Sequence, residues 1–132
     1  MKKVCVIGSG TMGNGIAHVF AQYGFSVSLM DVSQDQLNKA IHTITKNFDR
    51  QVEKGTITNI IKENALKNIS IHTSLETAVK DAELVVEAAT ENIELKLQIF
   101  KQIDEYAPAA CILATNTSSI SITKIAAVTS RP

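Results

Sequence analysis

The sequence predicts an α/β fold in which helices cover both faces of a doubly wound, mostly parallel sheet. Short apolar segments of strand length alternate with segments whose apolar residues recur at helical spacing. Two of the strand segments, residues 4–7 and 84–86, are apolar at successive positions. That pattern is typical of a parallel strand that is covered on both faces. A glycine-rich turn joins the first strand to the first helix.

The elements follow from these patterns in chain order. Between the first two strands, residues 13–23 have helical spacing and Gly24 is a typical helix end. After the second strand, residues 37–52 carry one apolar stripe of a long amphipathic helix, which Gly55 ends. Residues 57–66 predict a shorter helix that folds back on it, so a helical hairpin follows the second strand. The strands are expected at residues 4–7, 26–30, 69–73, 84–88 and 111–115.

The last third of the sequence predicts one more helix before the final strand and one after it. Asn92 is expected to cap a helix that runs to Tyr106. A final helical pattern covers residues 120–128 and leads into Arg131-Pro132, which is a poor helix end and a plausible start of another strand. Residues 1–132 are therefore expected to form one domain and to be a fragment of a longer protein.

Composition and charge narrow the class of protein. The 132 residues are 45% hydrophobic, enough for one core, and 13 Lys and Arg balance 13 Asp and Glu. This balance gives no support to a nucleic-acid partner, and no apolar run approaches the ~20 residues of a membrane span. Cys5 and Cys111 lie in apolar strings and are interpreted as buried free thiols. We expect a soluble, cytoplasmic protein without a metal site.

The glycine-rich turn predicts a Rossmann-type dinucleotide site. It follows a strand and opens a helix, as a phosphate-binding turn must. Gly8 permits the tight turn, a side chain at Gly10 would block a pyrophosphate, and Gly13 lets helix and strand pack closely. The helix N-terminus offers free N–H groups to the phosphates. The alternative is a strand-to-helix turn with structural glycines. The motif G-x-G-x-x-G is Gly8-Ser9-Gly10-Thr11-Met12-Gly13.

Asp31 is the candidate for binding the adenosine ribose. It ends the second strand, 18 positions after Gly13, where the ribose-binding acid is expected. Its carboxylate can accept hydrogen bonds from the 2′- and 3′-hydroxyls, each worth ~1.5–3 kcal/mol, and would repel a 2′-phosphate. No Arg follows it in Val32-Ser33-Gln34, so NAD is favoured over NADP. The alternative, that Asp31 or Ser33 only caps the next helix, is compatible with this role.

Three segments in one register resemble the 3-hydroxyacyl-CoA dehydrogenases, and the bacterial 3-hydroxybutyryl-CoA dehydrogenase branch most closely. The resemblance covers the whole chain, including the hairpin of residues 34–66, which a minimal Rossmann unit lacks. The segments are Val6-Ile7-Gly8-Ser9-Gly10-Thr11-Met12-Gly13-Asn14-Gly15-Ile16-Ala17, Val85-Val86-Glu87-Ala88-Ala89-Thr90-Glu91-Asn92 and Asn116-Thr117-Ser118-Ser119.

The resemblance implies further roles at the cofactor site. Glu91 and Lys96 match positions that line the NAD site near the nicotinamide. Ser118 matches the serine that contacts both cofactor and acyl group, which makes it the substrate-orienting residue. Without the resemblance, Glu91 would only stabilise a helix N-terminus, Lys96 would be a solvated helix residue, and Ser118 would cap the last helix.

The resemblance also implies an acyl-CoA substrate. Lys54 matches a lysine that contacts coenzyme A, and Asn47 stands where the family usually has a serine for the same ligand. Arg50, one helical turn before Lys54, adds positive charge on the same face. The alternative is that these residues are only the exposed face of an amphipathic helix.

The resemblance places the chemistry outside this chain. The family removes the 3-hydroxyl proton with a histidine that a glutamate orients, and both are expected beyond Pro132, as is the helical C-terminal domain that makes the parent a homodimer. His18, His42 and His72 are interpreted as structural, none of them at a strand's carboxyl end. The chain is therefore expected to bind NAD without turning over substrate. A free-standing NAD-binding sensor, a methyltransferase and a hydroxyacid dehydrogenase that acts without coenzyme A are the alternatives.

Overall fold

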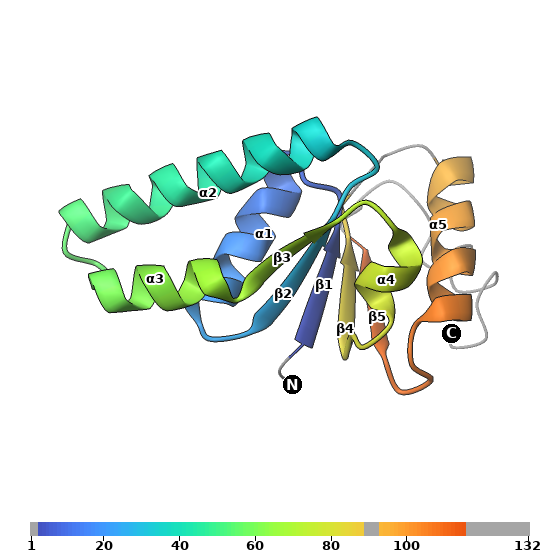
Figure 1. Ribbon diagram of the computed structural model, residues 1–132. Helices are drawn as coiled ribbons and strands as arrows, with labels where there is room; N and C mark the ends of the chain where they lie inside the picture. Colours follow the sequence, from blue (N-terminus) through green and yellow to red (C-terminus); the bar gives the residue numbers. More distant parts are fainter. Residues whose placement is uncertain (1–2, 89–92, 116–132) are drawn as a thin grey trace.

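A computed structural model describes residues 3–88 and 93–115 as helices on both faces of a parallel sheet (Figure 1). Each predicted strand lies within one residue of its observed bounds. The elements in chain order are β1 (Lys3–Ile7), α1 (Thr11–Gln22), β2 (Ser26–Met30), α2 (Gln34–Glu53), α3 (Asn59–Lys67), β3 (Ile69–His72), α4 (Leu75–Val79), β4 (Leu84–Glu87), α5 (Ile93–Tyr106) and β5 (Ile112–Thr115).

The sheet has the strand order β3-β2-β1-β4-β5, and all four strand pairs are parallel. The order reverses beside β1, because the chain passes from β1 to β2 on one side and later places β4 on the other. Such a switch point opens a crevice at the carboxyl ends of the strands. The predicted doubly wound fold is confirmed, and the crevice lies where β1, β2 and β4 end.

Successive residues of β1 face two different cores. Val4 and Val6 pack with residues of α1, α2 and α3, whereas Cys5 and Ile7 pack with residues of α4 and α5. This division explains why β1 is apolar at every position. Helices α2 and α3 run alongside each other as the predicted hairpin after β2 (Figure 1).

Polar side chains begin the hairpin helices. The Ser33 hydroxyl accepts a hydrogen bond from the Gln36 amide at 3.3 Å at the start of α2, and the Thr58 hydroxyl accepts one from the Ile61 amide at 3.2 Å at the start of α3. Ser33 therefore does cap the helix after Asp31. Among the described helices, none is long and apolar enough to cross a membrane.

Two local features differ from the sequence-based expectations. The short helix α4 between β3 and β4 was not predicted. Strand β3 ends at His72, so the expectation that no histidine lies at a strand's carboxyl end is wrong. The His72 imidazole nevertheless lies 3.0 Å from the Ser70 hydroxyl of the same strand, which gives it a local partner. The helical pattern at residues 120–128 and the Asn92 cap lie outside the described residues.

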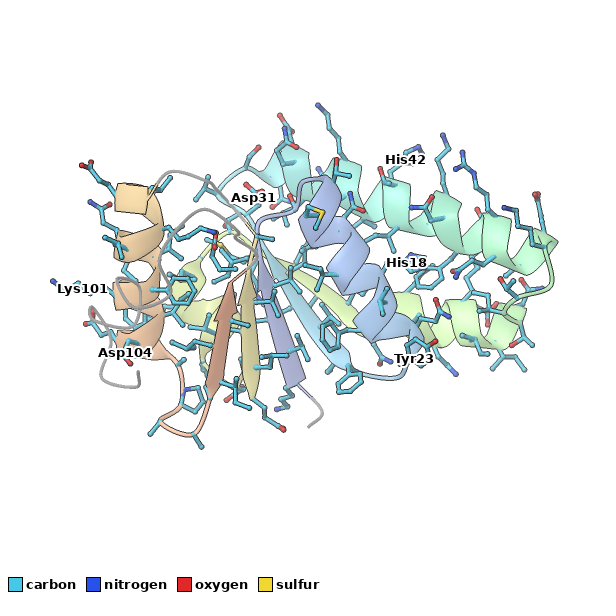
Figure 2. The ribbon with its side chains drawn as sticks, turned by 180° about the vertical axis from the view of Figure 1, so that it is seen from behind. His18, Tyr23, Asp31, His42, Lys101 and Asp104 are labelled. Atoms are coloured by element: carbon cyan, nitrogen blue, oxygen red, sulfur yellow. The ribbon has the colours of Figure 1, made fainter. Side chains whose placement is uncertain are left out.

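His18 packs inside the α1–α2 interface, as its structural interpretation requires. Its ring stacks on Phe48 with centroids 3.9 Å apart, and its Nε2 lies 2.8 Å from Oε1 of Gln51 (Figure 2). Gln51 in turn donates to Oε1 of Gln22 at 3.0 Å. The chain of amides fixes the orientation of a half-buried ring between two helices.

Cys5 and Cys111 are both buried and free, and both belong to the core on the α5 side of the sheet. Burial raises the pKa of the Cys5 thiol to about 12, with the neighbouring Cys111 as a smaller cause. Cys5 therefore remains a protonated thiol near neutral pH, which makes it unreactive.

The glycine turn holds α1 unusually close to β1. An added Cβ at Gly13 would lie 1.7 Å from the carbonyl oxygen of Gly8, a distance at which the backbone must move. Gly8 itself has a φ of 98°, a conformation that favours glycine. The spacing of helix and strand at this point is set by the missing side chain.

We expect Gly13→Ala to lower the free energy of unfolding by ~1–3 kcal/mol or more, the usual cost of an overpacked core. The cost is high because the added methyl group meets the backbone of Gly8, which cannot move aside as a side chain can. Gly15→Ala is the matched control: it lies in the same helix with nothing within 4 Å of the added Cβ. It should stabilise the helix by ~0.5–1 kcal/mol. Urea unfolding measures both. Equal effects of the two substitutions would contradict the steric account.

Glu87 and Lys96 form an ion pair inside the protein. Nζ of Lys96 lies 2.7 Å from Oε1 of Glu87, and both side chains are fully buried. Glu87 ends β4 and Lys96 lies in the first turns of α5, so the pair ties this helix to the carboxyl edge of the sheet. The alternative interpretation of Lys96, as a solvated helix residue, is therefore wrong.

We expect Lys96→Met to cost ~3–5 kcal/mol of folding stability, because it leaves the Glu87 carboxylate buried without its ammonium partner. Exchanging both residues for apolar ones of similar volume (Glu87→Leu with Lys96→Met) should cost clearly less than the single change. Denaturant titrations of the two variants decide the point. A double variant as unstable as Lys96→Met would mean that the charges do not act on each other.

Candidate functional site

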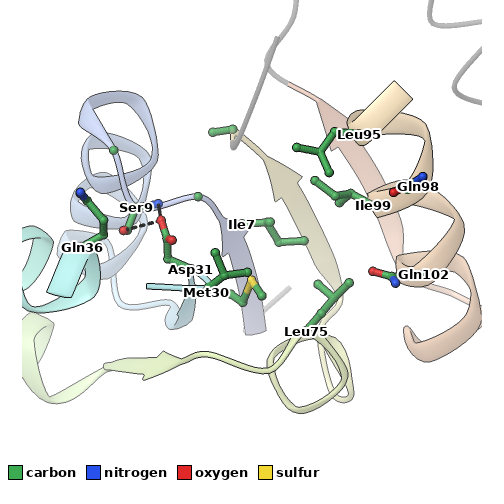
Figure 3. A pocket seen from close by; sticks show the side chains of 14 residues that line it. Ile7, Ser9, Met30, Asp31, Gln36, Leu75, Leu95, Gln98, Ile99 and Gln102 are labelled. Carbon is green, nitrogen blue, oxygen red and sulfur yellow. Dashed lines mark hydrogen bonds between the residues drawn. The ribbon is translucent and has the colours of Figure 1, made fainter. Parts of the chain in front are cut away.

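A pocket lies at the carboxyl edge of the sheet, at the predicted switch point (Figure 3). Strands β1, β2 and β4, the glycine turn, the start of α2, and helices α4 and α5 contribute to it. Its lining residues are Ile7, Gly8, Ser9, Gly10, Met30, Asp31, Val32, Gln36, Leu75, Ala88, Leu95, Gln98, Ile99 and Gln102.

The glycine turn forms the side of this pocket below the N-terminus of α1. The Gly8 amide donates to the Met30 carbonyl at 2.7 Å, which fixes the turn against β2. Gly10 is the N-cap residue of α1, is exposed and has nothing within 4 Å of an added Cβ. No side-chain oxygen caps the helix, and no acidic residue lies in its first turn. Free N–H groups beside open space are what a pyrophosphate requires, so these residues fit the diphosphate of a dinucleotide.

The Asp31 carboxylate is held in place by the turn on one side and by the next helix on the other. Its Oδ2 accepts hydrogen bonds from the Ser9 amide at 3.1 Å and from the Ser9 hydroxyl at 2.8 Å (Figure 3). Its Oδ1 accepts one from the Ser33 amide at 3.1 Å. Asp31 remains partly exposed, so the fixed carboxylate can still be reached from the pocket.

The remaining walls are apolar with a polar rim. Met30, Leu75 and Ile99 contribute apolar side chains to the lining, as do Val32, which is largely exposed, and Leu95, which is about half exposed. Gln36, Gln98 and Gln102 supply neutral hydrogen-bonding groups. Among the described residues that line the pocket, Asp31 is the one with a formal charge. An apolar slot beside a single carboxylate suits an uncharged adenine with a hydroxyl-bearing ribose.

The other residues expected at the cofactor site differ in where they lie. The side chain of Lys96 is buried against Glu87 and does not line the pocket, although its neighbour Leu95 does. Thr11 and Met12 are exposed at the start of α1 and line a separate, apolar hollow on that helix. Glu91 and Ser118 lie outside the described residues.

The residues expected to contact coenzyme A lie together on the second half of α2 and at its C-cap, which is Lys54. Arg50 and Lys54 are exposed, and Asn47 is half-buried. Gln36, at the start of this helix, lines the pocket. At 1.5 Å of rise per residue, Arg50 lies roughly 20 Å farther along the axis. The structure therefore separates Arg50 and Lys54 from the pocket at the carboxyl edge of the sheet.

Two features of the site were not expected from the sequence. The bond between Ser9 and Asp31 joins residues 22 positions apart, and no pattern indicates it. The burial of Glu87 was not expected either. An acid that ends an apolar run (Leu84-Val85-Val86) is nevertheless a signal for a buried charge with a partner. Within residues 3–88 and 93–115, no group of three or more His, Cys, Asp or Glu side chains could hold a metal ion.

Comparison with known proteins agrees with this geometry. A model of the family "3-hydroxyacyl-CoA dehydrogenase, NAD binding domain" matches residues 3–132. A 3-hydroxybutyryl-CoA dehydrogenase from Bradyrhizobium diazoefficiens is 47% identical over the whole chain, which spans 45% of that protein. A 3-hydroxyadipyl-CoA dehydrogenase from Escherichia coli is 44% identical over the whole chain and 28% of its own length.

The fold agrees equally well. The crystal structure of (S)-3-hydroxybutyryl-CoA dehydrogenase from Ralstonia eutropha superposes with a TM-score of 0.94 at 45% identity, over 99% of this chain and 46% of that one. The chain thus spans about half the length of these 3-hydroxybutyryl-CoA dehydrogenases. It belongs to the 3-hydroxyacyl-CoA dehydrogenase family and is an NAD-binding domain of that family.

Proposed function

We propose that this domain is the cofactor-binding half of an enzyme that interconverts 3-hydroxyacyl-CoA and 3-oxoacyl-CoA. The observation that carries the proposal is the pocket itself, where an uncapped helix N-terminus and a fixed carboxylate lie side by side next to an apolar slot. The names of the relatives supply the acyl-CoA substrate. NAD, when bound, supplies the hydride acceptor for oxidation of the 3-hydroxyl carbon.

The residues of this chain divide the work of binding the cofactor. The backbone at Gly10 and the first N–H groups of α1 would hold the pyrophosphate, and Asp31 would accept from the adenosine ribose. The resemblance assigns Glu91, Lys96 and Ser118 to the nicotinamide end. Since the Lys96 ammonium is buried against Glu87, its part in that assignment is to hold α5 beside the pocket.

We place the proton-abstracting histidine outside these 132 residues. His18 is packed between helices, His42 lies exposed on α2, and His72 pairs with Ser70; none lines the pocket. The helical C-terminal domain and the homodimer of the parent enzyme remain part of the same proposal. Two free buried thiols support a reducing, cytoplasmic setting.

We expect the domain to bind NAD and to discriminate against NADP, because a 2′-phosphate would meet the Asp31 carboxylate, and the described residues of the lining include no cation to offset it. Asp31→Ala should weaken NAD by ~1.5–3 kcal/mol through the lost bond to a charged acceptor. Calorimetric titration with both cofactors measures this. Asp35→Ala, which removes an exposed acid in the first turn of α2, is the control and should leave NAD affinity unchanged. Equal affinities for NAD and NADP would contradict the proposal.

We expect Lys54→Ala, made in the complete enzyme, to raise the KM for acyl-CoA and to leave the KM for NAD unchanged, because Lys54 lies away from the dinucleotide pocket. The effect should shrink as salt rises, since exposed charges are screened over ~10 Å at 0.1 M. Steady-state kinetics at two ionic strengths tests it. Lys67→Ala, on α3, serves as the matched exposed lysine. An unchanged KM for acyl-CoA would leave Lys54 as a solvated residue only.

A further inference from the structure

Ser9 occupies the variable position between the first two glycines of the turn, yet it is almost completely buried, with 2% of its surface exposed. Both of its hydrogen-bond donors, the amide and the hydroxyl, point to the same oxygen of Asp31, at 3.1 and 2.8 Å. A side chain so enclosed cannot itself present much surface to a ligand. Its effect on ligand binding must pass through the carboxylate that it holds.

The Asp31 carboxylate can accept a limited number of hydrogen bonds, and the protein already supplies most of them. An ionised carboxylate offers about four acceptor positions, two on each oxygen. Ser9 fills the two positions on Oδ2, and the Ser33 amide fills one on Oδ1. Within the part of the chain that the structure describes, one acceptor position on Oδ1 is therefore left for a ligand. A ribose offers two vicinal hydroxyls.

We propose that Ser9 is a positioning residue that sets how the ribose is recognised: it fixes Asp31 so that the carboxylate accepts from one ribose hydroxyl, through Oδ1. This inference rests on the proposed binding of NAD. It adds a further residue, Ser9, and a preference for one of the two ribose hydroxyls. The sequence alone predicts bonds to both hydroxyls, because an unconstrained carboxylate can accept from each. The pair of bonds from Ser9 removes that freedom before the ligand arrives, which lowers the entropy cost of binding.

Ser9 is suited to this role by its place on the turn. Gly8 is bonded through its amide to the Met30 carbonyl, so the turn is fixed to the residue directly before Asp31. The Ser9 amide then reaches Oδ2 from the backbone, and the hydroxyl closes a second bond to the same atom. With alanine at position 9 the amide bond would remain, and one acceptor position on Oδ2 would become free.

The test is equilibrium binding of NAD and of two analogues that lack either the 2′- or the 3′-hydroxyl of the adenosine ribose. For the unmodified chain we expect one analogue to bind about tenfold more weakly than NAD and the other within about twofold, because one hydroxyl is bonded to Asp31. Similar losses for the two analogues would overturn the proposal. This measurement needs no variant, so it stands whatever a substitution does to folding.

The variant Ser9→Ala separates positioning from direct contact. We expect it to weaken NAD by about threefold to tenfold and to bring the affinities of the two analogues closer together, since the carboxylate can then turn and accept from either hydroxyl. Ser26→Ala, an exposed serine at the opposite end of β2, is the matched control and should change neither quantity. An unchanged NAD affinity and an unchanged difference between the analogues in Ser9→Ala would refute a role for the hydroxyl.

A double-mutant cycle decides whether Ser9 acts through Asp31. In an Asp31→Ala background, Ser9→Ala should cause no further loss of NAD affinity beyond about twofold, because the group that it positions is gone. The same loss in both backgrounds would show that Ser9 acts independently, and the proposal would fail while the NAD site stood. No binding of NAD to the unmodified chain would instead overturn the proposed function and this inference together.

Discussion

The close contact between α1 and β1 at Gly13 is the constraint on which the site depends. With no side chain at this position, the helix approaches the carbonyl of Gly8 so closely that even a methyl group would not fit. The approach places the N-terminus of α1 directly over the end of β1, and the ends of β2 and β4 lie on either side in register with it. The N-terminus of α1 is thus positioned at the edge of the sheet by packing of backbone on backbone, which side-chain motion cannot loosen.

The opposite wall of the pocket depends on a different interaction. Helix α5 supplies Leu95 and Ile99 to the pocket, and its buried Lys96 is paired with Glu87 at the end of β4. A fully buried ion pair is weak evidence for stability, since its desolvation opposes its attraction. It is, however, strongly directional. Two apolar side chains could slide past each other along the sheet, whereas the ion pair fixes which turn of α5 lies beside the end of β4.

The strands were predicted well because an apolar run with turn residues at both ends leaves little choice of where a strand begins and ends. It missed α4, which is five residues long and shorter than the window in which helical spacing can be seen. Burial of Lys96 was equally invisible, because a charged residue in a helix is solvated by default and only the position of Glu87 in space reverses that expectation. The bonds from Ser9 to Asp31 depend on the turn geometry that brings two distant segments together. The glycine motif and Asp31 could be recognised because their spacing in the sequence is characteristic of a dinucleotide site. The remaining contacts of the site are tertiary.

The arrangement suggests how one protein can separate two phosphate-bearing ligands. In the pocket, positive potential comes from the backbone N–H groups of α1, and the described part of the lining carries the negative charge of Asp31. Such a site accepts a diphosphate that is aligned with the helix and penalises any further phosphate placed near the ribose. Near the end of α2 the positive groups include the exposed side chains of Arg50 and of the C-cap residue Lys54, which can follow a flexible, multiply charged ligand. In the proposed enzyme, fixed backbone dipoles would therefore select the dinucleotide, and mobile cations would attract coenzyme A.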